Sequence, residues 1–206
     1  MSNFKDSPKF SNHDDYYTPL SAWKNIYHLI PEKLRKGVIF EAFMLNSNEQ
    51  SKRHLTKLGL KVIGSNTINF LEDIPPKSSY DLIMSNPPFD RVISFPKRRQ
   101  SKKYQVLEKL FSLDKPFIII MNSTNLYSRW WSELVGDKKI CLIIPSQKIN
   151  YSKYEEGGKI KMDTGSSASF NSVYVCYKVL KENVFLNVLD VPKLDIKKTA
   201  TIKIKK

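Results

Sequence analysis

The residues best suited to chemistry in this chain form one short tetrad, Asn86-Pro87-Pro88-Phe89. The tetrad follows an apolar run from Tyr80 to Ser85 that predicts a buried β-strand. Asn86 offers an amide oxygen and the carbonyl of Pro87 offers a second acceptor, while the two prolines stiffen the turn because each fixes its own φ angle. Phe89 supplies a flat ring on which a planar group can stack. This combination suits one task, which is to hold an NH₂ group in front of an aromatic surface.

Such a grip matters most for an aromatic amine such as N6 of adenine, because its lone pair is delocalised into the ring. Two acceptors on the N–H bonds can hold the nitrogen and aim the lone pair. No strong base is needed if the electrophile is a methyl sulfonium, so the chemistry is mainly positioning. The alternative is a structural proline-rich turn, but the preceding buried strand favours the functional interpretation.

Three segments resemble motifs of the amino-methyltransferases, which transfer a methyl group from S-adenosylmethionine (AdoMet). Residues 80–89 are similar to motif IV, Asp15-Tyr16-Tyr17-Thr18-Pro19 is similar to motif X, and Ile39-Phe40-Glu41-Ala42-Phe43 is similar to strand 1 and motif I. Their order along the chain is that of the class in which the cofactor half comes first. Within the family, the chain resembles the DNA adenine-N6 methyltransferases, particularly small members from phages and large DNA viruses.

This resemblance implies a Rossmann-like α/β fold, AdoMet as cofactor, and methyl transfer to the N6 amino group of adenine in DNA with base flipping. On the target side it implies catalytic roles for Asn86, Pro87, Pro88 and Phe89. On the cofactor side the residues implied to bind AdoMet are Tyr17, Thr18, Pro19, Glu41, Phe43, Asn46, Asn69 and Phe70.

The chain departs from the family at two places on the cofactor side. Residues 41–51 contain no glycine, whereas the motif I loop usually has one that lets the backbone approach a ligand. Asn69 stands near the place where relatives have an acidic residue for the ribose hydroxyls. A second hypothesis is therefore a catalytically inactive methyltransferase-like protein that serves as a DNA-binding or structural subunit, for example in a virus. A third is amino-methylation of RNA or of a protein glutamine.

The formal net charge of +14 favours a polyanionic partner, expected to be DNA, with RNA as the alternative. Residues 97–103 carry five cations directly after the tetrad. Residues 146–171 interleave lysines with tyrosines, which is typical of nucleic-acid contact; this stretch is predicted to be a target-recognition loop, with a structural hairpin as the alternative. The residues expected to bind nucleic acid are Lys97, Arg98, Arg99, Lys102, Lys103, Lys148, Lys153, Lys159 and Lys161.

Composition also limits where the protein works. No apolar run approaches the roughly 20 residues of a membrane span, and the first residues lack a signal-peptide core. Cys141 and Cys176 lie in apolar runs and are predicted to be free thiols of an intracellular protein, in bacterial or host cytoplasm, in a nucleus or in a virion. His13, His28 and His54 lack zinc-ligand spacing, so no metal is expected. The oligomeric state does not follow from these patterns.

The elements that must position the tetrad are predicted to form one domain over residues 16–190, between a flexible N-terminus (1–15) and a basic C-terminal tail (191–206). The sheet is predicted to be mostly parallel, with an antiparallel edge strand and no third strand between residues 65 and 79. The predicted strands are 38–43, 60–63, 80–85, 116–121, 139–144 and the antiparallel 173–180. Helices are predicted over 18–30, 48–58, 101–113 and 125–134, with Thr18 as the first N-cap. Trp130 and Trp131 are predicted to lie in the core or at an interface rather than to stack on bases.

Overall fold

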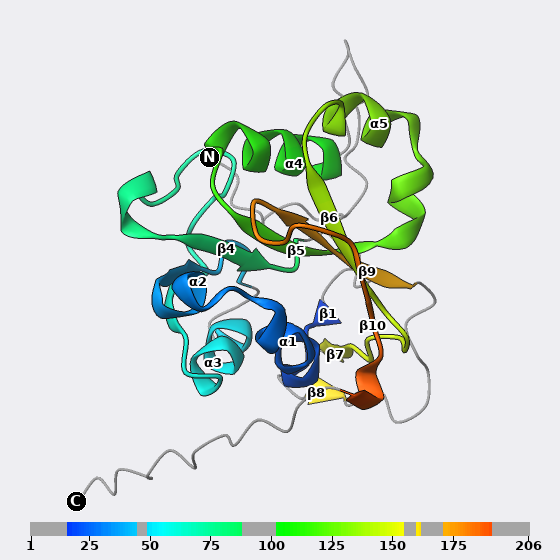
Figure 1. Ribbon diagram of the computed structural model, residues 1–206. Coiled ribbons are helices and arrows are strands. Elements are labelled where there is room, and N and C mark those ends of the chain that lie inside the picture. Colours follow the sequence, from blue (N-terminus) through cyan, green and yellow to red (C-terminus); the bar gives the residue numbers. More distant parts are fainter. Residues whose placement is uncertain (1–15, 45–48, 88–101, 155–159, 162–170, 191–206) are drawn as a thin grey trace, which may run out of the picture.

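The computed structural model describes residues 16–44, 49–87, 102–154, 160–161 and 171–190. Its middle layer is a seven-stranded sheet with the strand order β10-β6-β9-β5-β4-β2-β3. Figure 1 shows α4 and α5 above this sheet and α1, α2 and α3 below it. Helices therefore cover both faces of a mostly parallel sheet, and the predicted Rossmann-like α/β architecture is confirmed.

The strands that carry the candidate site run parallel to one another. They are β2 (Val38–Phe40), β3 (Lys61–Ile63), β4 (Leu82–Ser85) and β5 (Phe117–Asn122). Register pairs Phe40 with Ile83, and Ser85 with Ile119. All of β4 is buried, as expected for a strand covered on both faces. Because parallel strands end at the same edge, the carboxyl ends of these four strands meet where open α/β sheets bind ligands.

The antiparallel strand β9 (Ser172–Tyr177) lies inside the sheet and not at its edge. It pairs in antiparallel fashion with β5 on one side and with β6 (Ile140–Pro145) on the other. The edge is formed by β10 (Val184–Leu186), which runs parallel to β6. Residues 172–176 are all buried, which suits a strand with neighbours on both sides, whereas Phe185 of β10 is 73% exposed. The predicted direction of this strand is confirmed and its predicted edge position is wrong.

The opposite side of the sheet ends at β3. Residues 64–79 contain turns and the short 3-10 helix η2 (Lys77–Ser79) but no strand. Two prolines, Pro75 and Pro76, lie in this segment and lack the N–H groups that a further strand could donate to β3. The predicted absence of a third strand is confirmed.

The helices below the sheet begin and end slightly differently from the prediction. They are α1 (Leu20–Ile26), η1 (Tyr27–Leu29), α2 (Glu32–Lys36) and α3 (Gln50–Lys57). The N-cap of α1 is Pro19, without a side-chain hydrogen bond, so the prediction of Thr18 as N-cap is wrong. The reason is that Pro19 has an extended backbone with a ψ angle of 154°, and the helix begins only after it.

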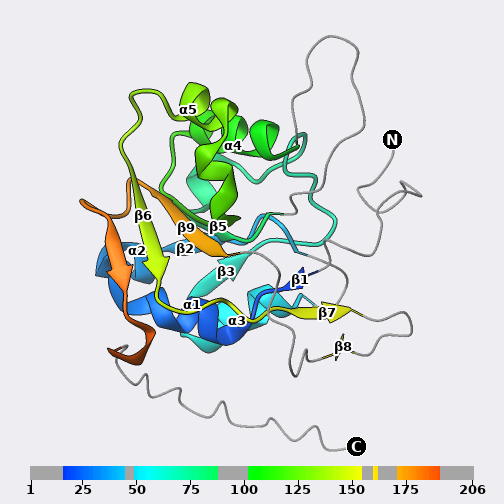
Figure 2. The ribbon, with the colours of Figure 1, turned by 90° about the vertical axis from the view of Figure 1, so that its right-hand side faces the viewer.

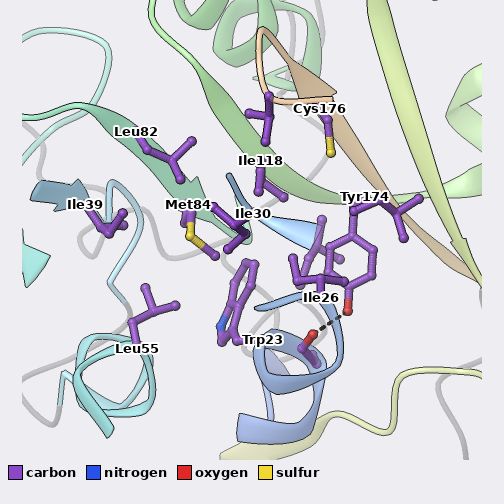
Figure 3. Close-up of a cluster of buried hydrophobic side chains, with 14 of the residues drawn as sticks. Trp23, Ile26, Ile30, Ile39, Leu55, Leu82, Met84, Ile118, Tyr174 and Cys176 are labelled. Carbon is purple, nitrogen blue, oxygen red and sulfur yellow. Dashed lines mark hydrogen bonds between the residues drawn. The ribbon is translucent and has the colours of Figure 1, made fainter. Parts of the chain in front are cut away.

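A buried cluster joins α1 to the middle of the sheet. Trp23 and Ile26 of α1 are fully buried among side chains from β2, β4, β5 and β9 (Figure 3). The hydroxyl of Tyr174 in β9 donates a hydrogen bond of 2.8 Å to the backbone carbonyl of Ala22. Cys176 belongs to the same cluster, and both cysteines are free and buried, as predicted. This packing holds the segment before α1 in a defined place under the sheet.

The second cluster lies between the sheet and the helices above it. Those elements are α4 (Lys102–Leu113), η3 (Ser123–Tyr127) and α5 (Arg129–Val135), and η4 (Val188–Asp190) ends the described chain. Trp131 is 7% exposed, and Trp130 packs edge-on to Tyr104 with 6.4 Å between ring centroids. Trp131 is therefore a core residue, as predicted, whereas Trp130 is only partly buried at the margin of the cluster.

A second, small sheet lies beside α1 (Figure 2). It joins β1 (Tyr16–Tyr17), β7 (Ser152–Tyr154) and β8 (Ile160–Lys161), all antiparallel. Within the predicted recognition loop at 146–171, β7 and β8 therefore form the hairpin that was the structural alternative, and contact with nucleic acid remains a prediction. No helix of the described residues is long and apolar enough to cross a membrane.

Candidate active site

The first two residues of the predicted catalytic tetrad lie at the carboxyl end of β4. Asn86 is partly buried and Pro87 is buried. Within the residues that the structure describes, the side chain of Asn86 has no hydrogen-bond partner. Pro88 and Phe89 lie outside the described residues. The amide that is expected to grip the target therefore lies at the ligand-binding edge of the sheet, next to the segment that follows β2.

The neighbouring side chain at this edge is Glu41, which follows β2 and is 1% exposed. Its Oε1 atom accepts hydrogen bonds from the hydroxyl of Ser85 and from the N–H of Phe43, the latter at 3.1 Å. Its Oε2 atom accepts a hydrogen bond from the hydroxyl of Ser51 in the first turn of α3. The N–H of Phe43 also lies 3.1 Å from Ser85 Oγ. One carboxyl group thus links the ends of two strands to the start of a helix.

Burial raises the pKa of Glu41 to about 6. Removal of the charged form from water is the main cause, and the hydrogen bonds from Ser51, Ser85 and the N–H of Phe43 offset part of it. Glu41 was predicted to bind the cofactor. Both of its oxygens accept hydrogen bonds from groups of the chain itself, and contact of Glu41 with a cofactor stays a prediction.

The backbone at the end of β3 passes very close to this segment. The N–H of Glu41 donates to the carbonyl of Ile63 at 3.0 Å, and Gly64 follows with a φ angle of +138°. A Cβ atom at Gly64 would lie 2.3 Å from the carbonyl oxygen of Glu41. Only glycine fits this position, because it lacks the Cβ atom and tolerates a positive φ angle. A glycine is therefore needed beside the motif I segment, although it belongs to the next strand.

A carboxylate lies close to the end of β3, although the first acidic residue after that strand in the sequence is Glu72. Glu49 precedes α3 and has a left-handed backbone with a φ angle of 45°. The ammonium group of Lys52 lies 3.2 Å from Glu49 Oε2 and donates to the carbonyl of Gly64 at 3.3 Å. Lys52 therefore bridges the carboxylate to the end of β3. The sequence did not reveal this proximity because Glu49 lies before β3 in the chain, between β2 and α3.

An aromatic pair lies among the residues that were predicted to bind the cofactor. The rings of Phe43 and Phe70 are 4.7 Å apart at a 52° angle, and Phe70 is 1% exposed. Asn69 shapes the turn after β3, because its Oδ1 accepts from the N–H of Leu71 at 3.2 Å. The structure thus brings three of the predicted cofactor residues to one side of the edge and commits the side-chain oxygen of Asn69 to the turn.

The segment that resembles motif X lies against α3. Tyr17 and Thr18 are each 5% exposed, and Pro19 is partly buried. His54 of α3 places Nδ1 3.1 Å from the carbonyl oxygen of Thr18. Since α3 also carries Ser51, this helix joins the segment to the Glu41 network. Asn46, the remaining predicted cofactor residue, lies outside the described residues.

Only part of the predicted nucleic-acid surface can be located. Lys103, in the first turn of α4, donates to Asn125 Oδ1 at 3.3 Å, and Lys148 is exposed. Backbone register places Lys153 opposite Lys161 in the small sheet, and Lys102 begins α4. The predicted residues outside the described part of the chain are Lys97, Arg98, Arg99 and Lys159.

Sequence reasoning missed the two serines that bind Glu41. Ser85 is the residue directly before the tetrad and is fully buried, and Ser51 lies in the first turn of α3, whose sequence is mostly polar. A polar residue at the end of an otherwise apolar strand was the available signal for Ser85. Among the described residues, no group of three His, Cys, Asp or Glu side chains could hold a metal ion.

Comparison with known proteins identifies the fold. No family model matches the chain, and no curated protein matches it in sequence. Among solved structures, a candidate class I AdoMet-dependent methyltransferase from Listeria monocytogenes has a TM-score of 0.53 at 11% identity, over 90% of this chain and 70% of that protein. The chain has the class I methyltransferase fold. An AdoMet-dependent O-methyltransferase from Thermotoga maritima has a TM-score of 0.39 at 10% identity, over 76% of this chain and 64% of that protein.

Proposed function

We propose that this protein transfers a methyl group from AdoMet to the N6 amino group of adenine in DNA, with the target base flipped out of the duplex. The observation that carries the proposal is the position of Asn86 and Pro87 at the carboxyl end of β4. That edge is where open α/β sheets bind their ligands. The class I methyltransferase fold supports the transfer, and the Asn-Pro-Pro-Phe tetrad supports an amino group as the acceptor.

The chain supplies the grip on the target nitrogen. The side-chain oxygen of Asn86 and the carbonyl of Pro87 accept the two N6–H bonds and turn the nitrogen lone pair toward the methyl donor. Phe89 stacks on the extruded base. AdoMet, when bound, supplies a methyl group on a positively charged sulfur. The proton can leave after the methyl group has transferred, so the residues act by positioning rather than as a strong base.

The residues on the cofactor side fit AdoMet in three respects. The partly buried ring of Phe43, which packs against the buried ring of Phe70, offers an apolar wall for an adenine ring. Glu49 holds a carboxylate near the end of β3, where Rossmann-type folds bind ribose hydroxyls with an acidic residue. Gln50 Oε1 is buried without a hydrogen-bond partner among the described residues, and a ligand donor such as the ammonium group of AdoMet would satisfy it.

The charge of the chain favours nucleic acid over a protein glutamine as the substrate. The net charge is +14, and cations cluster directly after the tetrad. Binding that depends on phosphate contacts weakens steeply as salt concentration rises. Adenine in DNA is therefore the first substrate to test, and adenine in RNA is the second.

The test combines binding and transfer. Calorimetric titration with AdoMet comes first, followed by transfer of labelled methyl groups to single-stranded and duplex DNA, to the same DNA with N6-methyladenine at every adenine, to RNA, and to a glutamine peptide. We expect AdoMet binding and transfer only to DNA with free adenine N6. Asn86→Ala should lower transfer about 100-fold while AdoMet affinity changes little.

Two results would replace the proposal. Absence of AdoMet binding up to millimolar ligand, with salt-sensitive DNA binding retained, would favour the inactive DNA-binding protein. Transfer to RNA or to the peptide but not to DNA would keep the chemistry and change the substrate.

A further inference from the structure

The role of Glu41 can be inferred from its contacts. Its carboxylate receives three hydrogen bonds, and the three donors come from different parts of the chain: the N–H of Phe43 after β2, the hydroxyl of Ser85 at the end of β4, and the hydroxyl of Ser51 in α3. The side chain is 1% exposed. These contacts tie the carboxylate to three parts of the chain itself, so Glu41 can act on the site through its neighbours.

Two of these donors lie next to residues of the candidate site, Ser85 beside Asn86 and Phe43 beside Phe70. Ser85 is joined by a peptide bond to Asn86, so the hydrogen bond to Ser85 fixes the start of the turn that carries the target-gripping amide. The N–H of Phe43 fixes the backbone that places its ring 4.7 Å from Phe70, on the cofactor side. The same carboxylate therefore sets the distance between Asn86 and the Phe43–Phe70 ring pair.

A buried carboxylate is a costly way to hold a fold together, because the charged form loses its hydration. An apolar residue would pack between two strands and a helix without that penalty. It could not accept three hydrogen bonds at once, and the N–H and hydroxyl groups would then lose their partners. What the carboxylate adds is a defined geometry among the end of β2, the end of β4 and the start of α3. In an active site, a displacement of about 1 Å can lower a reaction rate about 100-fold.

We propose that Glu41 is a positioning residue that sets Asn86 through Ser85, and the Phe43–Phe70 pair through the N–H of Phe43, without contacting AdoMet. The catalytic consequence rests on the proposed function, whereas the structural consequence does not. Loss of the link, which is the pair of hydrogen bonds that Glu41 accepts from Ser85 and from the N–H of Phe43, should lower the rate of transfer more than the affinity for AdoMet. The target and the methyl donor would then no longer be held in one arrangement.

The experiment uses the full chain and three variants, Ser85→Ala, Glu41→Gln and Glu41→Ala. Glu72→Gln is the matched control, because this exposed glutamate lies on the turn after β3 and changes the charge by the same amount. Three quantities are measured. They are amide hydrogen exchange over residues 41–44 and 84–87 (Pro87 carries no amide hydrogen), AdoMet affinity by calorimetry, and the single-turnover rate of methyl transfer to adenine-containing DNA.

Ser85→Ala should speed exchange at 84–87 and lower the transfer rate at least about tenfold, with AdoMet affinity within about threefold of the parent. Glu41→Gln should keep more of the rate than Glu41→Ala, because an amide oxygen still accepts from Ser85 and the N–H of Phe43 while its NH₂ donates to Ser51. Glu72→Gln should change none of the three quantities.

Two outcomes overturn the inference. One is a loss of AdoMet affinity of about tenfold or more in both Glu41 variants but not in Ser85→Ala, which would make Glu41 a direct ligand. The other is unchanged exchange at 84–87 in Ser85→Ala and Glu41→Gln, which would show that the link positions nothing. If the parent protein transfers no methyl group, the proposed function fails, and hydrogen exchange still decides whether Glu41 positions residues 84–87.

Discussion

Replacing Glu41 with glutamine should change how stability depends on pH. The folded protein raises the pKa of this carboxyl from 4.5 to about 6 because the group is buried. Between those two values the folded state holds a proton that the unfolded state has lost, so this group makes the protein less stable as pH rises through the interval. The difference of about 1.5 pKa units corresponds to about 2 kcal/mol, at about 1.36 kcal/mol per unit.

The measurement is urea unfolding followed by tryptophan fluorescence, which is suitable because Trp23 and Trp131 are buried. The free energy of unfolding of the parent minus that of Glu41→Gln should fall by about 2 kcal/mol between about pH 4 and about pH 7.5. Most of the change should lie between the two pKa values, since the glutamine variant cannot ionise at this position.

Glu72→Gln serves as the control, because Glu72 is exposed and its replacement should leave the pH dependence of the parent unchanged. If the difference between parent and Glu41→Gln stays constant within about 0.5 kcal/mol over the same pH range, Glu41 ionises as it does in water. Burial would then not raise the pKa of this carboxyl group.

Three further outcomes are expected. Gly64→Ala should lower the free energy of unfolding by about 3 kcal/mol, because the new Cβ would lie 2.3 Å from a backbone carbonyl oxygen. Gly59→Ala is the control: its φ angle is also positive, at +83°, but a Cβ there would meet no atom within 4 Å. It should cost about 1 kcal/mol in the same urea measurement. Glu49→Gln should weaken AdoMet binding about tenfold in calorimetry through loss of a carboxylate near the end of β3, and an unchanged affinity would remove Glu49 from the site. Lys103→Gln should lower the salt dependence of DNA binding by about one phosphate contact, with AdoMet affinity unaltered.

Six strands of the main sheet were predictable because their signals are local, whereas β10 and the strands of the small sheet were not predicted. The apolar runs at β4 and β5 lie within about two residues of their observed bounds, and Pro75 and Pro76 marked the segment that forms no strand. The position of β9 was not predictable. A buried apolar run shows that a strand is covered, but it does not show which strands lie beside it, and here β10 takes the edge.

The candidate site divides in the same way. Asn86 and Pro87 were recognisable because an amide and two prolines after an apolar run form a local pattern. The partners of Glu41 were not recognisable, since Ser51 lies 10 residues away and Ser85 lies 44 residues away in the chain. A serine in a helix or at a strand end is ordinary, and only its neighbour in space gives it a role.

The sequence alone determined where the main strands lie and what chemistry the tetrad can perform, because side-chain periodicity and the fixed φ angle of proline act over a few residues. The tertiary structure alone decided which groups surround Glu41 and how the two sides of the site are joined. The physical reason is that the burial, the pKa and the hydrogen-bond partners of a side chain depend on which elements meet. Here the ends of β2 and β4 and the start of α3 meet only when the fold is assembled.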